Sequence, residues 1–434
     1  MVYYKEQWRT SLRIVTGFEL AKTVLSRRAR GDEGPDEREA TVREIIGEVR
    51  SKRDAALYHY TEKFDGIKLT SLQVNKEKIA AAYQKTDEQV VSAINLAAER
   101  IRSYHATQKN ILLHDSVKSG VGWLVRPLER VGIHVPGFTS PLPSSLLMTV
   151  IPARVAGVGE IILVTPPQKS GEVAPVTLVA ADIAGVDRIF SIGGAHAIAA
   201  LAFGTETIPS VDKIIGPGNA FVTLAKKLLF GVVGIDALQG PSEVLIIADD
   251  TANIEYCAAD LLAQAEHPSG SAVLVTTSME LADKIVRETE AQLKNLPRPE
   301  TATESLEKNG IVAVVASVDE AIELANLYAP EHLLLMVDKA NTYIEKVRNA
   351  GCIVTGKKGT IALGDYVTGP SHVLPTGGTA RFASPLSILD FIKLTSVSNI
   401  EDSILKKIGP AARTLATAEG LDAHAKAVEK RLKS

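Results

Sequence analysis

Apolar residues recur at helical spacing along the first third of the chain. Residues 36–64 and 77–106 each place apolar side chains three or four positions apart, which puts them on one face of a helix. These positions are Val42, Ile45, Ile46 and Val49 in the first stretch, and Ile79, Tyr83, Val90, Ile94, Ala97 and Ile101 in the second. Asp65-Gly66 is a stop signal for the first helix. We expect both helices to pack against a sheet and to carry no chemistry themselves.

From about residue 128 the pattern changes to short β-rich runs that alternate with helical runs. The predicted strands are 161–165, 188–192, 213–215, 244–248, 272–276, 312–316, 333–337 and 352–354. The helix candidates between them include 254–266, 280–293, 319–328 and 341–350. This alternation predicts parallel sheets joined by crossover helices, with enough units for two such domains. The last forty residues return to a helical pattern.

Length and composition narrow the class of protein. At about 150 residues per domain, the 434 residues predict two to three domains. The 48 Lys and Arg nearly balance the 51 Asp and Glu, which argues against a nucleic-acid binder that tracks phosphates. Two cysteines, Cys257 and Cys352, cannot build a disulfide framework. We expect both to be structural thiols in a reducing compartment.

Nothing in the pattern predicts a membrane segment. The first residues lack the apolar core of a signal peptide. The longest apolar region, near 142–164, is interrupted by Pro143, Pro152 and Arg154. We therefore expect a cytoplasmic, multidomain enzyme with neither a nucleic acid nor a membrane as partner.

Two glycine-rich turns each follow a predicted strand and open a helical run. They lie at Ser191–Ala200 and at Ile215–Thr223. Glycines in such a turn let the backbone approach a pyrophosphate at a helix N-terminus. Neither turn is the complete G-x-G-x-x-G pattern, and each alone is more often a tight turn. Together they leave a cofactor site and two tight turns equally open.

Candidate chemistry gathers around the later histidines. Gln264 and His267 are three residues apart, so a helix places both on one face, although the pair alone is a weak metal signal. Glu331 and His332 come directly before an apolar strand, where a carboxylate and an imidazole suit proton transfer near neutral pH. The alternative for the first pair is a capping or surface role, and the alternative for the second is a helix-to-strand loop that happens to be polar.

A long loop is predicted at residues 364–382. It contains Asp365, His372, Arg381 and several glycines. Long loops inside compact domains are uncommon and are usually functional. We therefore expect this loop to contribute to the site.

Motifs along most of the chain resemble those of histidinol dehydrogenase. The resemblance covers about residue 30 to the end, and the motifs occur in the family's order. They lie at 141–148, 193–195, 200–209, 212–219, 240–245, 264–267, 328–333, 364–366 and 372–382, followed by a histidine in the tail. The resemblance implies an α/β fold of two incomplete Rossmann-like domains with parallel sheets. It also implies helical N- and C-terminal extensions that mediate dimerisation, so that the sites of a homodimer are shared.

On this basis we expect four segments. Residues 1–25 would form an N-terminal arm, and residues 380–434 a C-terminal helical extension. Residues 26–128 together with 243–379 would form a discontinuous first Rossmann-like domain. Residues 129–242 would form the second.

The resemblance also implies the roles of individual residues. The family's metal ligands, for one Zn²⁺ per subunit, fall on Gln264, His267, Asp365 and His424. Its general base falls on His332, and its activator of water on Glu331. Its NAD contacts fall on His134, His196 and Asn219. Its substrate contacts fall on Ser242, Gln264, His267, His332, Asp365, His372, Glu419 and His424.

The implied reaction is a pair of successive NAD-dependent oxidations that convert L-histidinol through L-histidinal to L-histidine, the last steps of histidine biosynthesis. A related metal- and NAD-dependent dehydrogenase of another polar alcohol, such as a sulfonated diol, is the first alternative. The carboxylate of Glu419 disfavours that anionic substrate. A catalytically silent binding protein of the same fold is the second alternative, and intact Glu331 and His332 argue against it.

The chain departs from the family pattern at the cofactor positions. The family usually has tyrosine where this chain has His134, glycine where it has Phe138, and glutamine where it has His196. Pro268 also follows His267 where the family usually has another residue. The departures predict an altered pose of NAD more than an altered reaction.

Overall fold

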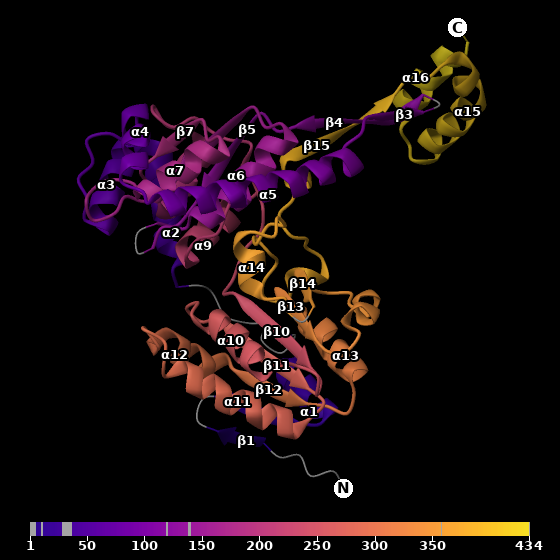
Figure 1. Cartoon of the computed structure of the whole chain (residues 1–434). Helices are drawn as coiled ribbons and strands as arrows, with labels where there is room; N and C mark the ends of the chain where they lie inside the picture. Colours follow the sequence, from indigo (N-terminus) through magenta and orange to yellow (C-terminus); the bar gives the residue numbers. More distant parts are fainter. Residues whose placement is uncertain are drawn as a thin grey trace. The chain divides into compact units, whose positions relative to one another are not determined.

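Two largely parallel sheets form the frame of the chain (Figure 1). The computed structural model describes residues 6–9, 12–27, 37–118, 120–137, 140–356 and 358–433. Contacts divide the chain into a first unit, residues 1–106 with 128–391, and a second unit, residues 107–127 with 392–434. Both parallel sheets lie in the first unit.

The larger sheet has seven strands in the order β1-β2-β12-β11-β10-β13-β14. Its strands are β1 Glu6–Arg9, β2 Leu12–Thr16, β10 Glu243–Ala248, β11 Ser271–Thr276, β12 Ile311–Val314, β13 His332–Met336 and β14 Cys352–Thr355. Only β1 is antiparallel to its neighbour. Every residue of β10 is buried because helices cover both faces of the sheet.

The two faces of this sheet pack against different helices. Val244 and Ile246 belong to the core with α10 Ile254–Ala265, α11 Met279–Leu293 and α12 Glu300–Asn309. The alternate residues Leu245 and Ile247 belong to the core with α1 Phe18–Leu25 and α13 Val318–Tyr328. This alternation follows from the two-residue period of a strand, and it explains why the run reads as continuously apolar.

The smaller sheet has five parallel strands in the order β7-β6-β5-β8-β9. They are β5 Arg130–His134, β6 Glu160–Val164, β7 Arg188–Phe190, β8 Lys213–Ile215 and β9 Gly234–Ile235. One face packs against α2 Glu39–Lys52, α3 Asp54–Asp65, α8 Gly194–Phe203 and α9 Ala220–Leu229. The helices α6 Pro143–Ala156 and α7 Pro175–Ala184 contact each other, and α6 also contacts β5.

The strands predicted from the sequence are confirmed to within two residues at each end. Strands β1, β2, β5 and β9 of these two sheets were not predicted. The long helix expected at 36–64 is divided at Arg53, which adopts a left-handed φ of 51° between α2 and α3. The helix expected at 77–106 is divided into α4 Lys76–Gln84 and α5 Glu88–Leu112.

Two further segments differ from expectation. Residues 341–350 contain the 3₁₀ helix η2 Ala340–Lys346 in place of an α-helix. The expected loop 364–382 holds the end of α14 Ile361–Tyr366 and the 3₁₀ helix η3 Thr379–Arg381.

The N-terminal segments pack differently from the expected domain boundaries. Strand β2 and helix α1, expected in a separate arm, are part of the seven-stranded sheet and its core. Helices α2 and α3, expected to join residues 243–379, pack on the five-stranded sheet. The reason is the apolar stripe of Val42, Ile45 and Val49, which is fully buried there.

The second unit holds the antiparallel sheet β15-β4-β3 and two C-terminal helices. Its elements are β3 Ser116–Lys118, β4 Val121–Pro127, β15 Ile392–Ser398, α15 Asp402–Ala418 and α16 Asp422–Leu432. Gly409 of α15 lets Leu432 approach closely, since a Cβ there would lie 2.9 Å from Leu432 Cδ2. No helix among the described residues is long and apolar enough to cross a membrane.

Candidate active site

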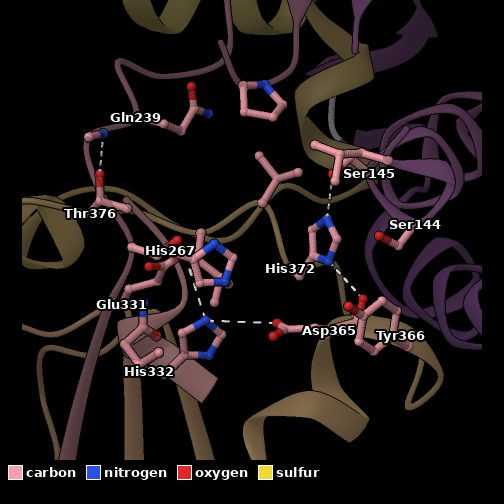
Figure 2. A pocket seen from close by; sticks show the side chains of 17 residues that line it. Ser144, Ser145, Gln239, His267, Glu331, His332, Asp365, Tyr366, His372 and Thr376 are labelled. Atoms are coloured by element: carbon pink, nitrogen blue, oxygen red, sulfur yellow. Dashed lines mark hydrogen bonds and ion pairs between the residues drawn. The ribbon is translucent and has the colours of Figure 1, made fainter. Parts of the chain in front are cut away.

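A pocket of about 270 Å³ lies in the first unit, at the amino-terminal edge of the seven-stranded sheet (Figure 2). His332 is the first residue of β13, and Ser242 directly precedes β10. The pocket brings together seven residues that the sequence singled out: Ser242, Gln264, His267, Glu331, His332, Asp365 and His372. Glu419 and His424 belong to the second unit and are not among the lining residues.

The sequence did not single out several other lining residues. These are Leu142, Ser144, Ser145, Pro217, Gln239, Gly240, Tyr366, Val373, Leu374 and Thr376. Most belong to the motifs at 141–148, 212–219, 240–245, 364–366 and 372–382. Their place in these motifs could have identified them as candidate site residues. Gln239 lies outside those motifs, and no feature of the sequence marked it.

Glu331 and His332 are buried side by side, being 5% and 6% exposed. His332 Nε2 lies 3.7 Å from Glu331 Oε1 and 3.9 Å from Asp365 Oδ1. Both distances are too long for hydrogen bonds. His332 Nε2 therefore lies near two carboxyl groups and is hydrogen-bonded to neither of them.

Burial is the main cause of the pKa shifts of His332, Asp365 and Glu331. It lowers the pKa of His332 to about 3, and nearby His372 and His267 contribute in the same direction. It raises the pKa of Asp365 to about 6. It also raises the pKa of Glu331 well above the usual value, although the Glu243 amide donates a 2.8 Å hydrogen bond to Glu331 Oε2. The His332 imidazole is thus neutral near pH 7 and can accept a proton.

His372 is held in one tautomer. Its Nδ1 donates to the backbone carbonyl of Asp365 at 2.7 Å, because a carbonyl oxygen can only accept. Burial lowers the pKa of His372, so the neutral ring carries no hydrogen at Nε2. Nε2 then accepts from the Ser145 hydroxyl at 3.2 Å. This contact links α6 to the loop that follows α14.

The donor set of the pocket fits a divalent metal. Gln264 is 3% exposed and lines the pocket, and its amide oxygen is the atom that could bind a metal. Its amide nitrogen Nε2, which is buried without a hydrogen-bond partner, carries hydrogens and can only donate. Such an orphaned donor is rare and points to an acceptor on a bound molecule. Burial lowers the pKa of His267, so its ring is neutral and free to bind a metal. With the Asp365 carboxylate, the pocket offers amide, imidazole and carboxylate donors that suit zinc.

Among the described residues, no group of three or more His, Cys, Asp and Glu side chains is placed to hold a metal. The expected ligand set supplies only two such side chains in this pocket, His267 and Asp365. Its other members are an amide, Gln264, and a histidine of the second unit, His424.

A second pocket, of about 520 Å³, lies at the carboxyl ends of the strands of the five-stranded sheet. His134 ends β5, Gly193 and Gly194 follow β7, and Asn219 follows β8. Both glycine-rich turns are therefore strand-to-helix turns, as predicted, and they open α8 and α9. The Asn219 side chain caps α9 by accepting from the amides of Phe221 and Val222, both at 3.1 Å.

The three residues expected at the cofactor line this second pocket. His134 Nδ1 donates to the carbonyl of Pro217 at 2.8 Å, and burial lowers its pKa to about 4. Burial lowers the pKa of His196 to about 3. Both rings are thus neutral near pH 7. Phe138, the third departure from the family pattern, lies outside the described residues.

His196 presents an unused acceptor. Thr61 donates its hydroxyl to the carbonyl of Leu57 at 2.8 Å, so it accepts from His196 Nε2, which lies 3.4 Å away. The hydrogen of the neutral ring is then on Nε2, and Nδ1 carries the lone pair. Nδ1 is buried without a hydrogen-bond partner.

Known proteins match most of the chain. The family model for histidinol dehydrogenase matches residues 28–432. Histidinol dehydrogenase of Dehalococcoides mccartyi is 50% identical over 435 residues, covering 97% of this chain and 100% of that protein. That of Streptococcus mutans is 50% identical over 396 residues, covering 91% and 92%. The crystal structure of histidinol dehydrogenase from Elizabethkingia anophelis superposes with a TM-score of 0.92 at 37% identity, covering 98% of this chain and 99% of that one. The chain therefore belongs to the histidinol dehydrogenase family of NAD-dependent oxidoreductases.

Proposed function

We propose that the protein oxidises L-histidinol to L-histidine in two successive NAD-dependent steps at the first pocket. The observation that carries the proposal is the convergence of seven expected site residues on one cavity. They come from the segments 242–267, 331–332 and 365–372, which are far apart in the sequence. The relatives named histidinol dehydrogenase support the choice of substrate.

His332 is the proposed general base of the first step. Its neutral Nε2 accepts the proton of the substrate hydroxyl, while the carbon that carries this hydroxyl gives up a hydride to NAD. The products are the aldehyde, NADH and a proton on the imidazole ring. The Asp365 carboxylate, 3.9 Å away and ionised near pH 7, then stabilises the imidazolium. General-base catalysis of this kind contributes ~10²–10⁴-fold to rate.

Glu331 is the proposed activator of water in the second step. Its raised pKa makes the ionised carboxylate a stronger proton acceptor than an ordinary one. Glu331 takes a proton from water as the oxygen adds to the aldehyde carbon, which forms the singly ionised hydrate. Loss of the hydride from that carbon to a second NAD gives the carboxylic acid.

Gln264, His267, Asp365 and His424 would hold the zinc ion, one per subunit. When bound, zinc supplies a Lewis acid and a template that orients the substrate. Three of these side chains, Gln264, His267 and Asp365, line the same pocket, which supports this assignment. His372, fixed between Ser145 and the Asp365 carbonyl, would contact the substrate together with Ser242.

NAD would occupy the pocket of about 520 Å³ beside the five-stranded sheet. Its turns present the N-termini of α8 and α9, which favour anions such as a pyrophosphate. His196 Nδ1 offers an acceptor for a ribose hydroxyl or an amide of the cofactor, where the family usually offers glutamine. His134 would stack against the cofactor or donate to it, and Asn219 would contact it from the cap of α9.

We further propose a homodimer in which the second unit completes the partner's site. The exposed apolar side chains of that unit support this, including Trp123 at 46%, Leu394 at 62% and Leu415 at 63% exposed. Glu419 and His424 of the partner subunit would then contribute a substrate contact and a zinc ligand. The two free cysteines are consistent with a cytoplasmic location.

A stoichiometric turnover tests the proposed function. Limiting L-histidinol is incubated with excess NAD, with and without a chelator, and NADH is counted at the end point. Two NADH per histidinol, abolished by chelation and restored by zinc, is the expected result. One NADH would remove Glu331 from the second step. No NADH from a metal-loaded enzyme would refute histidinol as substrate and favour another polar alcohol.

A further inference from the structure

A buried ion pair lies between the two pockets and lines neither of them. Lys226 of α9 pairs with Asp236, which directly follows β9, and their side chains are only 2% and 3% exposed. Desolvating two charges costs free energy that their attraction often fails to recover, so such a pair is weak evidence of a stabilising role. The hydrogen bonds of the Lys226–Asp236 pair connect it to a residue near each side of the active-site pocket, Gly216 and Gln239.

On one side the pair forms hydrogen bonds with both the backbone amide and the backbone carbonyl of Gly216. The Gly216 amide donates to Asp236 Oδ2 at 2.8 Å, and its carbonyl accepts from Lys226 Nζ at 3.0 Å. Gly216 has φ +114°, and a Cβ there would lie 2.2 Å from the carbonyl oxygen of His134. The next residue, Pro217, lines the active-site pocket and accepts from His134, which lines the cofactor pocket.

On the other side the same pair holds Gln239. The amide oxygen Oε1 accepts from Lys226 Nζ at 3.2 Å, and Nε2 donates to Asp236 Oδ2 at 3.1 Å. Gln239 and Gly240 line the active-site pocket. The Gly240 amide donates to Thr376 Oγ1 at 2.6 Å, which joins this wall to the loop after His372.

We propose that the Lys226–Asp236 pair is a positioning element that sets the distance between the bound dinucleotide and the substrate. It acts through Gly216–Pro217 on one side and Gln239 on the other, and it does not touch the reacting atoms. The inference rests on the proposed function for its kinetic test. Hydride transfer depends on donor and acceptor being held within a fraction of an ångström, so a loosened wall lowers kcat by about 10²-fold.

The test uses the double variant Lys226→Met/Asp236→Leu, which removes both charges and leaves neither buried alone. The matched control is Lys213→Met/Asp390→Leu, because this pair, 3.2 Å apart, lies in the same unit and lines neither pocket. Lys226→Gln/Asp236→Asn is the milder variant, since it also removes both charges and keeps an acceptor for Gly216 and Gln239. It serves if Lys226→Met/Asp236→Leu does not fold.

The kinetic readouts are kcat, the dissociation constant for NADH, and the primary isotope effect with substrate deuterated at the alcohol carbon. We expect kcat to fall by about 10²-fold in the double variant, with NADH affinity nearly unchanged and the isotope effect increased. The Lys213 control should match the wild type. Unchanged kcat and isotope effect in a folded variant, or parallel losses of affinity and rate without an isotope effect, would overturn the inference.

Amide hydrogen exchange tests the same link without any substrate. NADH binding should slow exchange in the peptide containing Gln239 and Gly240 in the wild type and in the Lys213 control, and not in the Lys226 double variant. Equal protection in all three proteins refutes the inference. A wild type that shows this protection but does not oxidise histidinol refutes only the proposed function.

Discussion

The buried imidazole of His196 makes the stability of the protein depend on pH. His196 is 2% exposed in α8, and burial lowers its pKa to about 3, whereas an exposed histidine has a pKa near 6.5. Below pH 6.5 the unfolded chain therefore binds a proton at this position, and the folded chain does not until about pH 3. Its contribution to stability is complete above pH 6.5 and is lost as the pH falls toward 3.

The size of this effect follows from proton linkage. One proton taken up only by the unfolded chain changes the free energy of unfolding by about 1.4 kcal/mol per pH unit. Between pH 7.5 and pH 5.0, the pKa of about 6.5 in the unfolded state gives a loss of about 2 kcal/mol. The loss hardly depends on the folded-state pKa, because the folded protein holds almost no proton on His196 at pH 5 for any pKa below about 4.

The measurement is urea unfolding of the wild type and of His196→Gln without ligands at both pH values. Other titrating groups, such as His134 and Asp365, cancel in the difference between the two proteins. We expect the variant to gain about 2 kcal/mol relative to the wild type on going from pH 7.5 to pH 5.0. His59→Gln, at an exposed position of α3, is the control and should show the same difference from the wild type at both pH values. A wild type and a His196→Gln variant with parallel pH dependences would refute the reasoning.

Four further predictions address other positions. His332→Gln should retain zinc and lose turnover by ~10²–10⁴-fold; unchanged turnover would remove His332 as the base. His424→Ala should lose zinc with an unchanged circular dichroism spectrum, and full occupancy by metal analysis would contradict its assignment as a ligand. Gly216→Ala should weaken NADH binding in a fluorescence titration and lower the melting temperature, because its Cβ would lie 2.2 Å from a carbonyl oxygen at φ +114°; wild-type values for both would show that the turn adapts. Cys257, fully buried with its pKa raised to about 12, should resist alkylation at pH 8 until the protein unfolds, and labelling of the native protein by mass spectrometry would show otherwise.

Much of the fold can be predicted from the sequence because its strands are buried on both faces. A doubly covered strand such as β10 is a continuous apolar run between turn signals, and such runs are visible without a structure. Strand β5, Arg130–His134, begins with a charged residue and contains a glycine, so its run is too short to stand out. Strand β2 becomes part of the sheet by pairing with β12, a contact about 300 residues away in the chain that no local pattern encodes.

The candidate site divides in the same way. Linear motifs identified Gln264, His267, Glu331, His332 and Asp365, because each motif is contiguous in the sequence. Their convergence on one cavity depends on the order of the strands, which brings the beginnings of β10 and β13 side by side. The contact between Ser145 and His372, and the role of Gln239 beside the Lys226–Asp236 pair, also depend on chain segments that meet only in the folded protein.

The amino-acid sequence by itself determined the class of the fold, the positions of most strands and the types of side chain available for chemistry. These follow from residue type and short-range periodicity, which are properties of neighbouring residues. Only the tertiary structure decided which helices cover which sheet and how deeply each ionisable group is buried. Burial in turn decides that His332 and His196 are neutral at pH 7 and that the pKa of Glu331 is raised, because the cost of holding a charge depends on every atom that excludes water from it.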